Sequence, residues 1–407
     1  MMYTLGIYIY ILLVRLAALF GHKKAKQKLV GHKQTLSVLK ENLKQDKDYI
    51  WFHVSSRGGF EQSRPMIERL HATHPEYRIV LTFFSPSGYE LAKNYQLVDA
   101  VCYLPFDTHR NVKRFLDVLQ PKMAFFIKCE FWLNCLTELK NRSIPVYSIS
   151  SVFNNRRSIL GVTGARLRLA LHCFTHLFVQ DDKSKEVLKT IGIDNVSVVG
   201  NTRFDRVVKV LEKSRQIPLL ETFGEGSRVF VAGGSEKDDE AVYMPFFNKN
   251  ADWKLIVLPN RVDDERIKDV EKQYEGICVR YTRATMENIR KAGCIIIDCC
   301  ELLSTIYKYG DIAFVGGSFG KGVRNVLEAA VYGVPLLIGP ENHRSYEAQA
   351  LFECGGAVKV QDAYDFGIKV KMLYDDKEYS SKVGAAAGSY VVKNAGATAR
   401  IFSEIGL

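Results

Sequence analysis

A glycine-rich stretch in the second half of the chain carries the residues best suited to chemistry. Residues 316–322 read Gly-Gly-Ser-Phe-Gly-Lys-Gly; they follow an apolar run and precede a helical segment that starts near Asn325. Glycines let a ligand approach the backbone, and a helix N-terminus offers unpaired N–H groups and a dipole that favour an anion. One turn further, the Glu328 carboxylate can accept hydrogen bonds from a ribose diol. The stretch from 316 to 335 therefore predicts a nucleotide-sugar site.

Two further loops have the same character. Residues 55–62, Ser-Ser-Arg-Gly-Gly-Phe-Glu-Gln, follow the apolar run 51–54, and residues 85–88 read Ser-Pro-Ser-Gly. Open α/β sheets bind ligands at the carboxyl ends of their strands. A single glycine-rich turn is as often a plain tight connection, but three in that topological place favour a binding function.

The elements that must position these loops alternate short apolar runs with longer helical segments, which is typical of βαβ units around a parallel sheet. The alternation pauses at 213–226 and restarts. We therefore predict GT-B architecture: two Rossmann-like domains, 22–215 and 224–385, facing across a cleft, with a C-terminal helix over 386–407 that packs back toward the first domain. The predicted strands are Tyr49–Val54, Arg78–Thr82, Met123–Ile127, Pro145–Ile149, His176–Val179, Arg228–Ala232, Lys254–Leu258, Cys294–Ile297, Asp311–Val315 and Pro335–Ile338.

The N-terminal segment predicts a membrane-anchor helix over 1–21. It is apolar apart from Thr4 and Arg15, and a cluster of lysines follows it. Basic residues on that side predict that the body of the protein stays in the cytoplasm. Because Arg15 must snorkel to an interface, a helix within one leaflet and a spanning helix are equally compatible with the sequence. A core helix of a soluble protein is the third alternative.

The composition of the chain limits which kinds of ligand and partner we expect. The net charge of +11 suits an anion, whether nucleic acid, lipid or phosphorylated ligand. No nucleic-acid-binding signature accompanies the basic residues, so we expect no nucleic acid. Nine cysteines without a C-x-x-C pair argue against a disulfide framework or zinc site and fit a reducing compartment. The consecutive acids Asp181-Asp182 and Asp263-Asp264 are not metal-binding D-x-D signals, so no metal or other cofactor is expected.

From about Tyr8 to its C-terminus the chain resembles the 3-deoxy-D-manno-octulosonic acid (Kdo) transferases of lipopolysaccharide assembly. The resemblance implies an inverting glycosyltransferase at the cytoplasmic side of the inner membrane that moves Kdo from CMP-Kdo to the lipid A precursor, lipid IVA. It rests on Trp-Phe-His at 51–53, Ser85 to Gly88 with Glu90, Leu-Pro-Phe-Asp at 104–107, Glu-Phe-Trp-Leu-Asn at 130–134, Val-Gln at 179–180, Gly-Asn-Thr-Arg-Phe-Asp at 200–205, and the third loop with Asn325 and Glu328.

The resemblance also implies site residues. Acceptor contacts are expected from Arg57, Gly58, Ser85, Ser87 and Gly88. Donor contacts are expected from Pro259, Asn260, Arg261, Cys300, Glu301, Leu302, Gly317, Ser318, Gly320, Arg324, Asn325, Val326, Leu327 and Glu328.

One departure concerns catalysis. The family's general base is a glutamate after the glycine of the first loop, and here that position is Gly59. Loss of a general base typically costs about a hundred- to ten-thousand-fold in rate. Glu130, which the family keeps near the acceptor, is one possible substitute. Glu61 is the other, but two residues along a helix turn its side chain about 200° away.

Other departures fall on the donor side. A family histidine is Arg324, a basic position is Asn260 followed by Arg261, and a glycine is Glu301. The arginines keep positive charge available, whereas Glu301 adds negative charge. Two alternatives therefore stay open: a catalytically weakened or silent paralogue that binds glycolipid or nucleotide, and a GT-B transferase for another nucleotide sugar.

Overall fold

The chain forms two compact units, each of which is described by itself. The computed structural model describes residues 2–44, 46–153, 161 and 164–407. Unit 1 comprises Met1–Arg206 and Gly396–Leu407, and unit 2 comprises Val207–Ala395. The domain limits expected from the sequence stay predictions.

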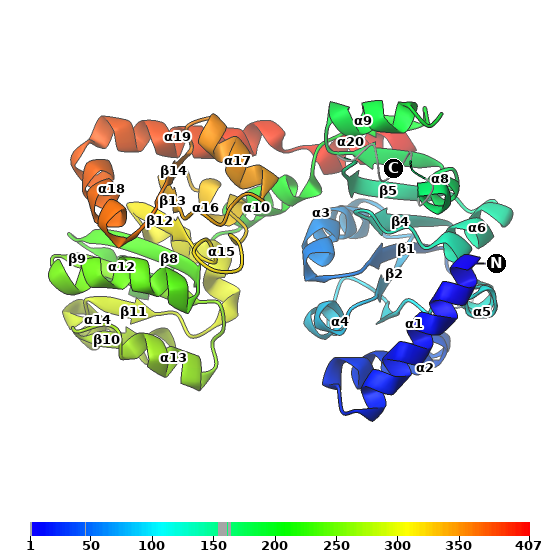
Figure 1. Ribbon diagram of the computed structural model, residues 1–407, viewed down its shortest axis with the longest axis horizontal. Helices are drawn as coiled ribbons and strands as arrows, with labels where there is room; N and C mark the ends of the chain where they lie inside the picture. Colours follow the sequence, from blue (N-terminus) through cyan, green and yellow to red (C-terminus); the bar gives the residue numbers. More distant parts are fainter. Residues whose placement is uncertain (1, 45, 154–160, 162–163) are drawn as a thin grey trace. The chain divides into compact units, whose positions relative to one another are not determined.

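Unit 1 is built on a parallel sheet with helices on both faces (Figure 1). Its strands are β1 Tyr49–Val54, β2 Arg78–Phe83, β3 Ala100–Tyr103, β4 Met123–Ile127, β5 Val146–Ser151, β6 His176–Val179 and β7 Val196–Val198. The spatial order is β3-β2-β1-β4-β5-β6-β7. Its helices are α1 Met2–Leu19, α2 Lys23–Asn42, α3 Arg57–Thr73, α4 Pro86–Ala92, α5 His109–Leu119, α6 Leu133–Asn141, α8 Ala165–Leu171, α9 Asp182–Lys189 and α20 Ala397–Ile405; α10, Thr202–Glu212, begins in this unit.

Alternating side chains of β1 pack into two separate hydrophobic cores, one on each face of the sheet. Trp51 packs with residues of α2, α5, α6, α8 and α9 on one face of the sheet. Phe52 packs with residues of α3, α4 and α20 on the other face, where α20 contributes Ile401 and Phe402. A parallel sheet covered on both faces needs such continuously apolar strands, and all six residues of β1 are buried.

Unit 2 repeats the plan in the order β10-β11-β9-β8-β12-β13-β14. Its strands are β8 Arg228–Ser235, β9 Trp253–Pro259, β10 Cys278–Arg280, β11 Cys294–Ile296, β12 Ile312–Val315, β13 Leu336–Ile338 and β14 Ala357–Lys359. Its helices are α11 Pro218–Gly224, α12 Lys237–Lys249, α13 Asp264–Glu271, α14 Met286–Lys291, α15 Leu303–Ile306, α16 Leu327–Ala330, α17 Tyr346–Glu353, α18 Ala363–Asp375 and α19 Lys377–Asn394, with 3-10 turns η2 Tyr281–Arg283, η3 Cys300–Leu302 and η4 Tyr307–Tyr309. The predicted α/β class with two parallel sheets is confirmed.

All ten predicted strands are present, with ends shifted by at most three residues. The sequence did not predict β3, β7, β10 and β14, which are the outermost strands of the two sheets. These strands are only three or four residues long. Short edge strands need no long apolar run, so they lack the signal that marks the central strands.

The N-terminal hairpin covers one part of unit 1. Helix α1 runs alongside α2 (Figure 1), and Gly21 makes the turn with a φ of 88°. Helix α2 packs on β3, where Gly31 leaves room for a ring: a Cβ at Gly31 would lie 2.2 Å from Tyr103. Helix α1 rests on the unit through α2 and through the hydrogen bond from Tyr3 to Asp107, while most of its large apolar side chains stay exposed.

Candidate functional site

Three neighbouring strands of unit 1 bring the acceptor loops together. Strand β1 pairs in parallel with β2 on one side and with β4 on the other. Their carboxyl ends therefore present the loops after Val54, Phe83 and Ile127 at one edge of the sheet. The loops touch directly, because the Ser85 N–H donates to the Ser55 carbonyl at 3.0 Å.

Glu130 is held at this edge by a hydrogen-bond network that is partly buried. The Trp132 indole N–H lies 3.1 Å from a Glu130 carboxylate oxygen and 3.0 Å from His53 Nε2. On the other side of the imidazole, Nδ1 lies 2.9 Å from the Thr82 hydroxyl. Because Nε2 accepts from Trp132, Nδ1 carries the proton. Burial lowers the pKa of His53 to about 3, so the ring is neutral.

This environment gives Glu130 the properties of a base. Burial raises the pKa of the carboxyl, and hydrogen bonds from Ser55 and Trp132 oppose that shift. A raised pKa makes the carboxylate a stronger proton acceptor at neutral pH. Two residues earlier, Lys128 has a φ of 67°. A side chain in the left-handed region costs free energy, and such residues cluster at functional sites.

Gly59 lies close by, in the first turn of α3. Its N–H donates to the hydroxyl of Ser56, the N-cap residue, at 3.4 Å. A Cβ at Gly59 would meet Val54 Cβ at 3.4 Å, which is ordinary contact, so the position has room for a Cβ atom. A Cβ at the preceding Gly58 would lie 3.9 Å from both Lys128 Nζ and an Arg203 nitrogen. The end of α3 therefore faces cationic side chains that suit an anionic acceptor.

The remaining predicted acceptor-side residues differ in their surroundings. Glu61 lies 3.1 Å from Arg206 and 3.4 Å from Arg64, and these ion pairs occupy its carboxylate. Ser85 caps α4 by accepting from the Gly88 N–H at 3.3 Å, and its hydroxyl lies 2.9 Å from that of Ser87. Arg57 is exposed at the start of α3. The structure thus brings Glu130, Gly59 and the cap of α4 to one edge and leaves Glu61 engaged elsewhere.

The glycine-rich loop of unit 2 follows β12 and is fixed by a buried aspartate of α12. The Asp239 carboxylate accepts from the backbone N–H groups of Gly317 at 2.6 Å, Phe319 at 3.0 Å and Glu236 at 2.8 Å. A Cβ at Gly316 would lie 2.4 Å from the Gly234 carbonyl oxygen. The loop after β12 and the loop after β8 therefore touch, and only glycine permits that approach.

The polar donor-side residues of unit 2 form a partly neutralised cluster. The Arg324 guanidinium pairs with Glu236, which also accepts from Asn260 at 3.2 Å. Asn325 donates to Glu328 at 2.9 Å. Part of the positive charge expected at 324 is thus offset by a carboxylate. Among the remaining predicted donor residues, Arg261 is exposed and lies 3.4 Å from Asp263. Glu301 is exposed as well. The turn η3 begins at Cys300 and ends at Leu302, which is half-buried.

Several predicted donor residues hold the loop instead of facing solvent. Ser318 is fully buried; its hydroxyl donates to the Val315 carbonyl at 3.1 Å and accepts from the Gly339 N–H at 2.9 Å. Pro259, Gly317, Val326 and Leu327 are buried too, while Gly320 is half-buried. Their roles in binding stay predictions, and the structure gives them packing roles in addition.

Beside the glycine-rich loop the structure shows basic side chains that the sequence analysis missed. Lys321, His343 and Arg344 line a hollow of about 550 Å³, together with Glu341. Glu341, His343 and Arg344 follow β13, which pairs with β12. The loops after β12 and β13 therefore leave the same edge of the sheet. Strand adjacency was the signal that could have found them. Cations beside glycines at strand ends suit a phosphate or a carboxylate.

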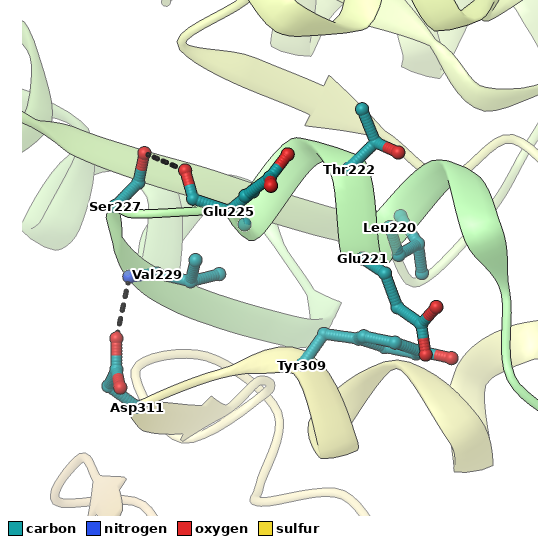
Figure 2. A pocket seen from close by; sticks show the side chains of 9 residues that line it. Leu220, Glu221, Thr222, Glu225, Ser227, Val229, Tyr309 and Asp311 are labelled. Carbon is teal, nitrogen blue, oxygen red and sulfur yellow. Dashed lines mark hydrogen bonds between the residues drawn. The ribbon is translucent and has the colours of Figure 1, made fainter.

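A second hollow of unit 2 has the opposite character. Figure 2 shows Glu221, Tyr309 and Asp311 among the side chains around it, and its volume is also about 550 Å³. Asp311 accepts from the Val229 N–H at 2.9 Å, just before β12 and at the start of β8. This hollow therefore lies at the amino ends of the strands and is lined by carboxylates. An anionic nucleotide fits the hollow at the carboxyl ends better.

Two Rossmann-like units with loops of this kind at their strand ends define the GT-B class. Solved structures share the fold. The UDP-GlcNAc 2-epimerase of Neisseria meningitidis, bound to UDP-GlcNAc, is similar with a TM-score of 0.62 and 16% identity over 88% of this chain and 99% of that one. The MurG protein of Acinetobacter baumannii is similar with a TM-score of 0.55 and 10% identity over 88% and 99%.

Sequence comparison relates the chain to one family within that class. Residues 25–206 match the family model of 3-deoxy-D-manno-octulosonic-acid transferase (kdotransferase). The transferase of that name from Aquifex aeolicus is 27% identical over 78% of this chain and 83% of its own length. The one from Haemophilus influenzae is 26% identical over 86% and 85%. Residues 25–206 thus match the Kdo transferase family model, and most of the chain is similar to Kdo transferases, so the predicted resemblance is confirmed.

Proposed function

We propose that the chain is an inverting glycosyltransferase that moves Kdo from CMP-Kdo to the lipid A precursor, with Glu130 as its general base. The observation that carries the proposal is the Glu130 network: a carboxylate of raised pKa, fixed by Trp132 at the edge where the acceptor loops meet. The relatives are named for Kdo transfer, which supports the sugar.

The chemistry assigns one role to each unit. In unit 1, Glu130 takes the proton of the acceptor hydroxyl while Lys128 and the N-terminus of α3 hold an acceptor phosphate. The hydroxyl oxygen attacks the anomeric carbon from the face opposite CMP, so the configuration inverts. In unit 2, the bond to the phosphate oxygen breaks and CMP leaves with the electron pair. Lys321 and Arg344 then offset the charge of the leaving phosphate.

We also propose that unit 1 binds the cytoplasmic face of a membrane with α1 lying in the interface. Among the described helices, Met2–Leu19 is long and apolar enough to cross a membrane. Hydrogen bonds nevertheless tie α1 to the unit along its length: Tyr3 donates to Asp107 at 2.6 Å, and Tyr10 accepts from Lys28 at 2.6 Å. A helix tethered in this way presents one apolar side outward, which favours the in-plane arrangement over a span.

The direct test is Kdo transfer from CMP-Kdo to the lipid A precursor in detergent micelles. The natural chain should form product slowly, and Glu130→Gln should lower the rate at least a hundred-fold. Glu61→Gln is the matched control and should keep the rate within about two-fold, because its carboxylate is engaged by arginines. An equal loss in both variants would contradict the role of Glu130.

A catalytically silent paralogue is the second candidate, and Gly59 favours it. Such a protein would bind CMP or the glycolipid without turnover. A ligand bound to the native state raises its apparent stability, so thermal shift with CMP and UDP separates the cases. Stabilisation by CMP without transfer supports the silent paralogue, and stabilisation by UDP alone supports a transferase for another nucleotide sugar.

A further inference from the structure

A groove of about 970 Å³ lies between α1, α2 and the segment that leads into α5. Its apolar walls come from Ile11 and Leu12 of α1, Leu36 of α2 and Phe106 before α5. The volume is at the upper end of the roughly 300–1,000 Å³ that ligand pockets cover. A groove with apolar walls and this size is suited to an acyl chain.

The charged side chains of the groove all have one sign. Arg15, Lys26, Lys33, Arg110 and Arg114 line it, and all five are exposed. No aspartate or glutamate is among the described residues of its lining. Within the described part of the chain, none of these five cations has a carboxylate partner within 4.0 Å. The charge is therefore available for an anionic headgroup.

His32 supplies a second observation. Both of its ring nitrogens are buried without a hydrogen-bond partner among the described residues. The ring stacks on Phe106 with a centroid distance of 4.0 Å. Buried polar atoms without partners are rare in folded proteins. A ligand with ester or hydroxyl groups between its apolar and charged parts would supply the missing hydrogen bond.

We propose that this groove is a binding site for an anionic phospholipid of the bilayer, distinct from the acceptor site; the inference rests on the proposed membrane-bound transferase. Packed rings lie between the two sites: the ring centroid of Phe84 is 4.4 Å from that of Trp132, the partner of Glu130, and 3.1 Å from the ammonium of Lys28. The bound phospholipid holds α1 and α5 together at the membrane surface.

The test measures binding of the full chain to vesicles of phosphatidylcholine with and without phosphatidylglycerol. Arg110→Gln/Arg114→Gln should weaken the preference for phosphatidylglycerol about 25-fold, from roughly five-fold per cation near an anionic surface. Lys40→Gln/Lys113→Gln is the matched control, because it removes two charges from α2 and α5 outside the groove. The control should keep the preference within about three-fold.

Lipid retained by the purified chain gives the second measurement. Mass spectrometry should find phosphatidylglycerol with the natural chain and the control, and at least ten-fold less with the arginine variant. Equal losses of retained lipid in the arginine variant and the lysine control would show that general surface charge causes the effect, and would overturn the proposed site. Displacement of the lipid by the lipid A precursor would make the groove an acceptor subsite and also overturn it.

The failures of the two proposals are distinguishable. A chain that binds phosphatidylcholine vesicles and transfers Kdo, but shows no groove-dependent lipid preference, contradicts only the groove. A chain that binds no vesicles of either composition and transfers no Kdo contradicts both proposals. Transfer without vesicle binding leaves the glycosyltransferase in place and removes its membrane-bound state together with the groove.

Discussion

Restoring a carboxylate at position 59 is the sharpest test of the catalytic reasoning. Gly59→Glu should raise the rate of Kdo transfer about a hundred- to ten-thousand-fold, because a general base contributes that much. This corresponds to roughly 3 to 5 kcal/mol of activation free energy. The smaller value is expected if Glu130 already acts as a substitute base in the natural chain.

The structure allows the substitution without loss of stability. The new Cβ would lie 3.4 Å from Val54 Cβ, and Gly59 does not require a positive φ. Replacing a helical glycine gains roughly 0.5–1 kcal/mol, and a carboxylate in the first turn of a helix gains about 0.3–1 kcal/mol. Partial burial of the charge offsets these gains. The free energy of unfolding should therefore stay within about 1 kcal/mol of the natural value.

The assay follows product by mass spectrometry under single-turnover conditions, with urea unfolding of each variant alongside. Gly59→Gln is the matched control, since it has nearly the same shape as glutamate but cannot take the proton. Its rate should equal that of the natural chain. If Gly59→Glu folds normally and is no faster than Gly59→Gln, a carboxylate at position 59 does not act as a base and the reasoning about this position is refuted.

Three further predictions concern individual side chains. The rate of the natural chain should fall with decreasing pH through a pKa above the ordinary glutamate range, because burial raises the pKa of Glu130 and only its carboxylate accepts a proton; Glu130→Gln should abolish that acid limb of the pH–rate profile. Asp239→Asn should lower the free energy of unfolding in urea by about 1–3 kcal/mol, because an amide oxygen alone cannot satisfy three backbone donors; an unchanged midpoint would contradict this. Gly88→Ala should cost about 1–3 kcal/mol in thermal unfolding, because its Cβ would lie 2.7 Å from Phe83, whereas Gly6→Ala, with nothing within 4 Å of its Cβ, should not destabilise.

The sequence by itself determined the architecture and the resemblance to the Kdo transferases. Central strands such as β1 and β8 are long apolar runs, because a parallel sheet with both faces covered tolerates few polar side chains. The glycines at 316 and 317 were informative for a similar reason. A Cβ at 316 would lie 2.4 Å from the Gly234 carbonyl oxygen, and the next position has a φ of 82°, so both positions favour glycine. Local backbone requirements of this kind can be recognised from the residue type alone.

Only the tertiary structure decided which side chains are available for chemistry. Ser318 belongs to the predicted donor loop, yet its hydroxyl is consumed by backbone groups. Glu61 is close to Gly59 in sequence, but Arg206, far along the chain, engages its carboxylate. Burial and long-range ion pairs depend on elements that are distant in sequence, so a local sequence pattern cannot predict them.

The same distinction applies to charge and to the membrane helix. The sequence showed a basic chain with an apolar N-terminus, and it left a spanning helix and an in-plane helix equally open. The contacts of α1 with Asp107 and Lys28, and the collection of unpaired arginines such as Arg110 beside it, arise only when α2 and α5 pack on the same sheet. Composition fixed how much charge the chain carries; packing fixed where that charge meets an apolar groove.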